Sequence, residues 1–168
     1  MWVARAGWRL LSITGFDRYI DDEGEMRWLL AGRAPLVRAS GRDITRSAAG
    51  RLAIEATLWM PTSFTSINWR AGDDPDTAVA TWHIGTEQPS VELHLDGEGR
   101  PRSVSMQRWG NPNGEPFSYY PFGGVLEDES TFGGFTIPTA MRVGWLWGTD
   151  RWDEGEFFRA RITDAAFL

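Results

Sequence analysis

Residues 43–64 form the only long stretch of this chain in which apolar residues recur with a helical period; almost everything else alternates as β-strands do. One broad face of the helical wheel collects Ile44, Ala48, Leu52, Ala56, Leu58 and Trp59. Asp43 is suited to cap the N-terminus of this helix. The helix should end before Pro61, because proline disfavours helical geometry in the residue that precedes it. The sequence therefore predicts one main α-helix at about residues 43–59.

The segments before and after this helix read as β-strands separated by turn-forming residues, as in a series of antiparallel hairpins. The predicted strands are residues 2–13, 16–20, 26–32, 35–39, 66–71, 77–85, 91–96, 101–109, 117–127, 135–147 and 156–165. With a single helix to cover them, a strongly curved sheet that wraps around this helix is the economical arrangement. We therefore predict an α+β, mostly β fold: one domain over residues 1–168, built as an antiparallel half-barrel or barrel.

Two residues of the predicted helix stand out. Gly50 lies in its middle, where glycine costs about 1 kcal/mol relative to alanine, and we interpret it as a close approach of helix to sheet. Glu55 falls about 20° from Ile44, inside the apolar face, with Arg51 one turn earlier. Three interpretations of Glu55 are open: an ion pair with Arg51, a polar anchor or general base in an apolar pocket, or a shifted helix phase that leaves it in water.

Composition excludes several classes of function. The net charge of −6 argues against nucleic-acid binding, which needs a basic surface. The chain has neither Lys nor Cys, so lysine Schiff bases, phosphate-loop lysines, thiol nucleophiles and disulfides are excluded. A nucleophile elbow and a dinucleotide fingerprint are absent as well. Because no apolar run is long enough to cross a membrane or to serve as a signal peptide, we expect a cytoplasmic protein.

The aromatic content is high, with ten Trp, nine Phe and three Tyr. These rings either fill an ordinary core or line a cavity. Five tryptophans from separate segments could converge: Trp69, Trp82, Trp109, Trp145 and Trp147. The last two follow Met141 and Val143 along one face of the predicted strand 135–147.

Both histidines fall in the predicted hairpin of residues 77–96. A loop at residues 86–89 would pair His83 with Glu92 and place them, with His94, on one face. Two imidazoles and a carboxylate could hold a divalent metal ion there. The alternative is a solvated outer face opposite an apolar inner one, which the clean alternation of this hairpin favours.

Several motifs, in this order, resemble an uncharacterised bacterial protein family. They are residues 35–41 (PLVRASG), 55–62 (EATLWMPT), 67–69 (INW), 93–100 (LHLDGEGR), 134–138 (GFTIP) and 158–162 (FRARI). The family is similar to the periplasmic lipoprotein carriers of the LolA/LolB type, whose curved antiparallel half-barrel encloses an apolar cavity under helices that form a lid. The resemblance covers nearly the whole chain and implies binding of an apolar ligand, but it brings no catalytic residues with it.

Two functions remain open. The first is the binding of an apolar or lipid-like small molecule between sheet and helix, without a cofactor. Its predicted site has Arg51 and Glu55 as the polar anchor; its walls are Trp59, Trp69, Trp82, Trp145 and Trp147. The second is a cofactor-free cyclase, isomerase or lyase that acts on an apolar substrate with Glu55 as its acid or base. An exposed edge strand could also support a homodimer.

Overall fold

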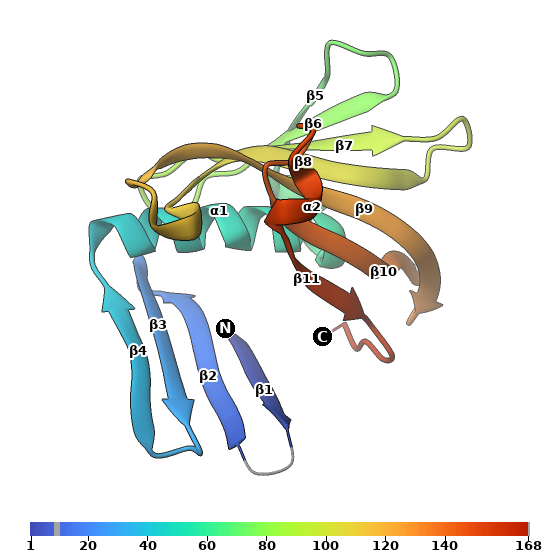
Figure 1. The fold of residues 1–168 in the computed structure, drawn as a ribbon. Coiled ribbons are helices and arrows are strands. Elements are labelled where there is room, and N and C mark those ends of the chain that lie inside the picture. Colours follow the sequence, from blue (N-terminus) through green and yellow to red (C-terminus); the bar gives the residue numbers. More distant parts are fainter. Residues whose placement is uncertain (9–10, 168) are drawn as a thin grey trace.

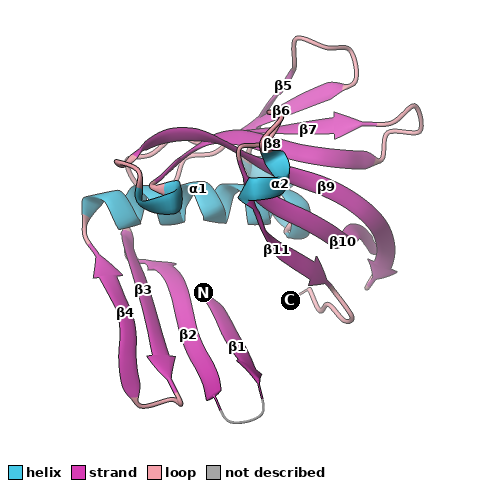
Figure 2. Cartoon of the chain, viewed as in Figure 1, coloured by secondary structure: helices cyan, strands magenta, loops and turns pink. Residues whose placement is uncertain are grey.

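The computed structural model describes residues 1–8 and 11–167. Side chains are described for all of these residues except Trp2, residues 5–8, Leu11 and Ser66. It contains a four-stranded and a seven-stranded antiparallel sheet, with the helix α1 (Arg42–Trp59) between them in the chain (Figure 1). Strands dominate the fold, as Figure 2 shows. A mostly β, antiparallel fold with one main helix is therefore confirmed.

The four-stranded sheet comprises β1 (Trp2–Trp8), β2 (Leu11–Ile20), β3 (Glu23–Leu30) and β4 (Ala34–Ser40), in that order. The β2–β3 hairpin turns at Asp21 and Asp22, whose φ angles of 52° and 60° are those of a turn that matches the twist of the two strands. One prediction fails here: the strand expected over residues 2–13 is two paired strands, with Trp8 opposite Leu11.

The seven-stranded sheet has the order β11-β10-β9-β8-β7-β6-β5, so that every strand pairs with its neighbours in sequence. Its strands are β5 (Asn68–Ala71), β6 (Thr77–Thr81), β7 (Ser90–Leu95), β8 (Pro101–Gly110), β9 (Ser118–Phe132), β10 (Phe135–Trp145) and β11 (Glu156–Arg161). Short helical segments complete the fold: the 3₁₀ turns η1 (Pro61–Ser66) and η2 (Pro112–Gly114), and the one-turn helix α2 (Trp152–Gly155).

The single sheet wrapped into a half-barrel or barrel is not what the structure contains. In the described residues, the two sheets have no strand in common and neither closes on itself. The chain leaves the four-stranded sheet at its edge strand β4, passes through α1, and begins the second sheet at the edge strand β5. The helix thus separates two sheets, whereas the prediction placed it inside one.

Helix α1 is buried on more sides than the helical wheel predicted. It contacts β7, β8 and β10 of the larger sheet and β2, β3 and β4 of the smaller one. As a result, every residue of the helix from Ile44 to Trp59 is buried or half-buried. The predicted face is therefore incomplete: Ala49, Ala53 and Ile54, which lie outside it, belong to the core.

The main core lies between α1 and the inner face of the seven-stranded sheet. The helix contributes Ala49, Ala53, Ile54 and Leu58; the sheet contributes Ala80, Val91, Leu93, Val104, Met106, Phe122, Leu126, Met141 and Val143. Burying one Val or Met side chain of this size stabilises the fold by about 1.5–3 kcal/mol. The small helix residues let the backbones of helix and sheet approach each other closely.

Gly50 marks this close approach, as predicted. A Cβ atom at Gly50 would lie 3.3 Å from Arg108 Cγ and 3.4 Å from Met106 Cε. The cap prediction is wrong, in contrast: the helix begins at Arg42 after Gly41, and Asp43 accepts a hydrogen bond from Trp109 Nε1 at 3.0 Å. The carboxylate therefore ties the first turn of the helix to β8.

No helix in the described part of the chain combines the length and the apolar character that crossing a bilayer requires.

The close approach at Gly50 yields a prediction about stability. Gly50→Leu should lower the free energy of unfolding by about 1–3 kcal/mol, because the added carbons overlap Met106 and Arg108. Gly50→Ala should change it by less than about 1 kcal/mol, because better helix propensity offsets the tight contact. Urea unfolding of both variants measures the two values, and equal stability of the two would contradict this packing.

Candidate functional site

A cluster of four charged side chains joins the two sheets to the helix. Asp17 comes from β2, Arg51 and Glu55 from α1, and Arg108 from β8. Arg51 reaches both carboxylates: its Nη2 lies 3.1 Å from Asp17 Oδ1, and its Nη1 lies 3.5 Å from Glu55 Oε1. Of the three interpretations of Glu55, the structure thus contains the ion pair with Arg51.

Burial governs the protonation of this cluster. Desolvation raises the pKa of Glu55 and of Asp17, while the positive charges of Arg51 and Arg108 act in the opposite direction. Desolvation also lowers the pKa of Arg108 to about 10, and the like charge of Arg51 adds to this effect. Two carboxylates and two guanidinium groups balance in charge, which is the condition under which a folded protein tolerates buried ions.

Arg108 was not singled out from the sequence, yet it is the most buried cation described, at 8% exposure. Its guanidinium carbon lies 4.6 Å from the ring centre of Phe122 and 5.1 Å from that of Trp145. Its Nη2 donates to the carbonyl oxygen of Ser47 at 3.4 Å. Trp145, which was predicted to be a cavity wall, therefore packs against the Arg108 guanidinium in a cation–π contact.

The indole N–H groups of two other predicted walls donate to partners other than Glu55. Trp59 Nε1 donates to the carbonyl oxygen of Pro138 at 3.3 Å, and Trp82 Nε1 donates to Thr57 Oγ1 at 2.8 Å. Both indoles thus brace the C-terminal half of α1.

Trp69 lies on the edge strand β5, is 38% exposed, and packs edge-on against Phe64. Trp147 departs from the predicted strand face: β10 ends at Trp145, and Leu146 adopts a left-handed φ of 62°, which breaks the alternation.

The histidine hairpin has a different register from the predicted one. The chain turns at Gly85 and Thr86, so that Glu92 pairs with Val79 and His94 with Thr77. His83 lies beyond the end of β6, away from Glu92. The described residues contain no group of three potential metal ligands. A register shift of four residues keeps each side chain on its face, so the alternation alone could not reveal the error.

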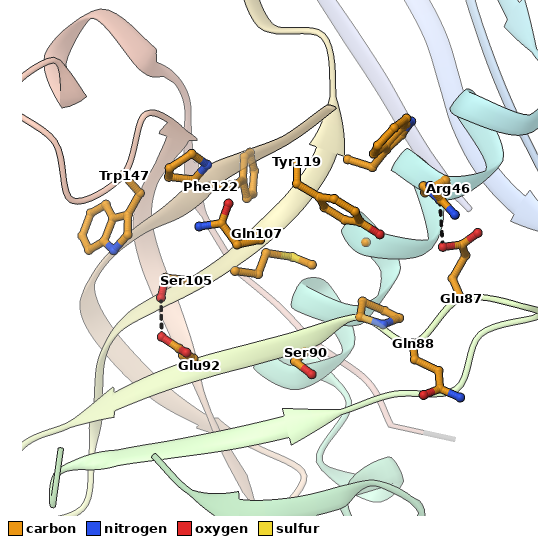
Figure 3. Close-up of a pocket in the computed structure, with 15 residues that line it drawn as sticks. Arg46, Glu87, Gln88, Ser90, Glu92, Ser105, Gln107, Tyr119, Phe122 and Trp147 are labelled. Atoms are coloured by element: carbon orange, nitrogen blue, oxygen red, sulfur yellow. Dashed lines mark hydrogen bonds and ion pairs between the residues drawn. The ribbon is translucent and has the colours of Figure 1, made fainter. Parts of the chain in front are cut away.

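The structure opens a groove where β7 and β8 separate. The two strands pair from Leu95 and Pro101 as far as Glu92 and Ser105. Beyond that point β7 pairs only with β6, and β8 pairs only with β9. The resulting groove has a volume of about 540 Å³ and lies over Gly50 and Arg46 of α1 (Figure 3). This volume is in the range of pockets that bind small molecules, about 300–1,000 Å³.

Aromatic rings form much of the groove wall. They are Trp109, Tyr119, Phe122 and Trp147. Trp109 and Tyr119 meet edge to face, with ring centres 5.2 Å apart. Trp147 lies against Gly123, where a Cβ atom would come within 2.7 Å of its Cγ. Two of the five tryptophans that could converge, Trp109 and Trp147, therefore line one groove.

Charged groups lie at the two ends of the groove, and the neutral polar residues Gln88, Ser90 and Gln107 line it as well (Figure 3). At one end Arg46 Nε donates to Glu87 Oε2 at 2.9 Å, which raises the pKa of Arg46. The Arg46 guanidinium also lies over the ring of Trp109, 4.8 Å from its centre. At the other end Ser105 Oγ donates to Glu92 Oε2 at 3.4 Å.

The separation of β7 and β8 could not be read from the sequence, because apolar alternation continues along both strands. Pro89, just before β7, gives no signal of this separation, because its carbonyl oxygen accepts from Trp82 and its nitrogen therefore faces β6 rather than β8.

Comparison with known proteins gives a family assignment. The sequence profile of DUF6920, described as a family of unknown function, matches residues 1–167. Neither a curated protein nor a solved structure matches the chain. The resemblance to an uncharacterised family is therefore confirmed, and the similarity to lipoprotein carriers stays a prediction.

The raised pKa of Glu55 predicts how stability depends on pH. As the pH rises above about 4.3, Glu55 in the unfolded chain loses its proton first, because its folded pKa is higher. The wild-type protein should therefore lose stability relative to Glu55→Gln, by less than about 1.4 kcal/mol per pH unit.

Urea unfolding of both proteins between pH 4 and pH 7 checks this expectation. Glu98→Gln is the control, because the Glu98 side chain is 69% exposed. A stability difference between wild type and Glu55→Gln that grows in favour of the wild type as the pH rises would contradict the predicted direction.

Proposed function

The chain belongs to this family of unknown function, and we propose that it binds a small apolar or lipid-like molecule in the groove where β7 and β8 separate. One observation carries the proposal: a groove of about 540 Å³ walled by four aromatic side chains. An apolar molecule that enters it removes both its own surface and these ring faces from water.

The groove has the composition of a ligand site. Met106, Pro121 and Phe122 are among its apolar lining residues, and the neutral polar residues Gln88, Ser90 and Gln107 line it too. Its charged groups stand at the ends, where they can fix the orientation of a bound molecule. An elongated molecule with an apolar body matches this distribution better than a compact polar one.

This location differs from the predicted one. The expected site lay around Glu55 and the C-terminal half of α1, whereas the groove lies over the N-terminal half. Among the predicted walls, Trp147 lines the groove, and Trp59, Trp69, Trp82 and Trp145 do not. The region under the helix is filled by core side chains instead.

The enzymatic alternative lacks an observation of this kind. Glu55 is not among the described residues that line the groove, and it lies 3.5 Å from Arg51 in a charge-balanced cluster. Binding is therefore the function that the geometry supports best. The expected ligand class, an apolar or lipid-like molecule, is also the one implied by the similarity to lipoprotein carriers.

Isothermal titration calorimetry with decanoyl-N-methylglucamide, a neutral amphiphile, tests the proposal below the critical micelle concentration. We expect saturable binding by the wild type. Trp147→Leu should weaken it about 3- to 10-fold, since the smaller side chain buries less apolar surface against the alkyl chain, at about 25 cal/mol per Å². Trp69→Leu is the matched control, because Trp69 is an exposed indole outside the groove. No saturable binding, or an equal loss in both variants, would refute the assignment.

A further inference from the structure

The groove carries one carboxylate that no cation balances. Its charged lining residues are Arg46, Glu87 and Glu92. Arg46 and Glu87 form an ion pair with side chains 27% and 18% exposed, so their charges compensate each other. Within the described residues, the Glu92 carboxylate has no cation at ion-pair distance, and its one hydrogen bond comes from the neutral hydroxyl of Ser105. A net negative charge therefore stays at the Glu92 end.

An indole lies at this same end. Ser105, which donates to Glu92, pairs across the sheet with Gly123 of β9. Trp147 rests on Gly123. Glu92, Ser105 and Gly123 occupy aligned positions on three neighbouring strands, which lie about 4.8 Å apart. The carboxylate and the Trp147 indole thus flank the same corner, with Gln107 nearby (Figure 3).

A carboxylate beside an indole face is a receptor for a positively charged group. The carboxylate attracts the charge directly, and the π-system of tryptophan binds cations more strongly than the rings of Tyr and Phe do. The other end of the groove already contains such a contact, because Arg46 lies over Trp109 and Tyr119, 4.8 Å and 5.9 Å from the ring centres. The net charge of −6 also raises the local concentration of cations.

We propose that the groove selects an organic cation: an amphiphile whose ammonium group binds between Glu92 and Trp147 and whose apolar body extends toward Tyr119. This inference rests on the proposed function and adds the charge of the ligand. An anionic amphiphile is disfavoured, because its head would meet Glu92 at one end and a guanidinium already paired with Glu87 at the other.

Three amphiphiles with one decyl-type chain separate the charge preference from binding itself. They are decyltrimethylammonium, decanoyl-N-methylglucamide and decyl sulfate, each titrated calorimetrically below its critical micelle concentration at physiological salt. The wild type should bind the ammonium probe about tenfold more tightly than the neutral one, and the sulfate most weakly. If the neutral probe binds and the ammonium probe binds no better, the charge selection is refuted and the groove assignment stands. If none of the three binds, both proposals fail.

Variants of Glu92 test whether this carboxylate causes the preference for the ammonium probe. Glu92→Gln should reduce the ratio of ammonium to neutral affinity from about tenfold to about threefold or less, and Glu92→Lys should make the sulfate the preferred charged probe. Glu98→Gln, the same charge change in the exposed turn between β7 and β8, should keep the wild-type ratio. A ratio that falls equally in Glu92→Gln and Glu98→Gln would overturn the proposal, because overall charge would then explain it. Glu92 is exposed, so these substitutions leave the core intact.

Discussion

The close packing of α1 between two sheets is the constraint on which the rest of this structure depends. Ala49, Gly50 and Ala53 let the helix backbone approach the larger sheet, and Arg51 reaches back to Asp17 of the smaller one. Larger side chains at these positions would push the helix away from the larger sheet. Without the charge of Arg51, the Asp17 carboxylate would be buried without a counter-charge. Gly50 of this same helix also lines the groove, so the close packing and the proposed binding site depend on the same part of α1.

Much of the fold could be predicted from the sequence, because period-two alternation and turn residues act locally. The helix over 43–59 and most strand positions follow from these patterns. The number of sheets does not follow from these patterns. Alternation indicates which face of a strand is apolar, but it does not indicate which strands become neighbours. The apolar wheel face was incomplete for a related reason: a helix between two sheets is buried by small residues such as Ala49, which carry little hydrophobic signal.

The candidate site was harder to predict, since it depends on where regular pairing stops. Glu55 and Arg51 were correctly placed near each other, because four residues span one helical turn. Trp147 does not lie on its expected face, because Leu146 adopts a left-handed backbone conformation. No residue type in this stretch predicts that conformation. The separation of β7 and β8 after Glu92 and Ser105 likewise has no strong sequence signal. Local patterns cannot report such tertiary events.

A ligand bound in the groove between β7 and β8 contacts different indole groups from one bound beneath the C-terminal half of α1. Two-dimensional proton–nitrogen NMR of the ten indole groups during titration with decanoyl-N-methylglucamide distinguishes the two locations directly. The Nε1–H signals of Trp109 and Trp147 should shift in a saturable manner, because both rings line the groove. The Nε1–H signals of Trp59 and Trp82, which donate hydrogen bonds to the Pro138 carbonyl oxygen and to Thr57 Oγ1, should not shift. Shifts confined to Trp59 and Trp82 would instead locate the ligand beneath the C-terminal half of α1 and refute binding in the groove.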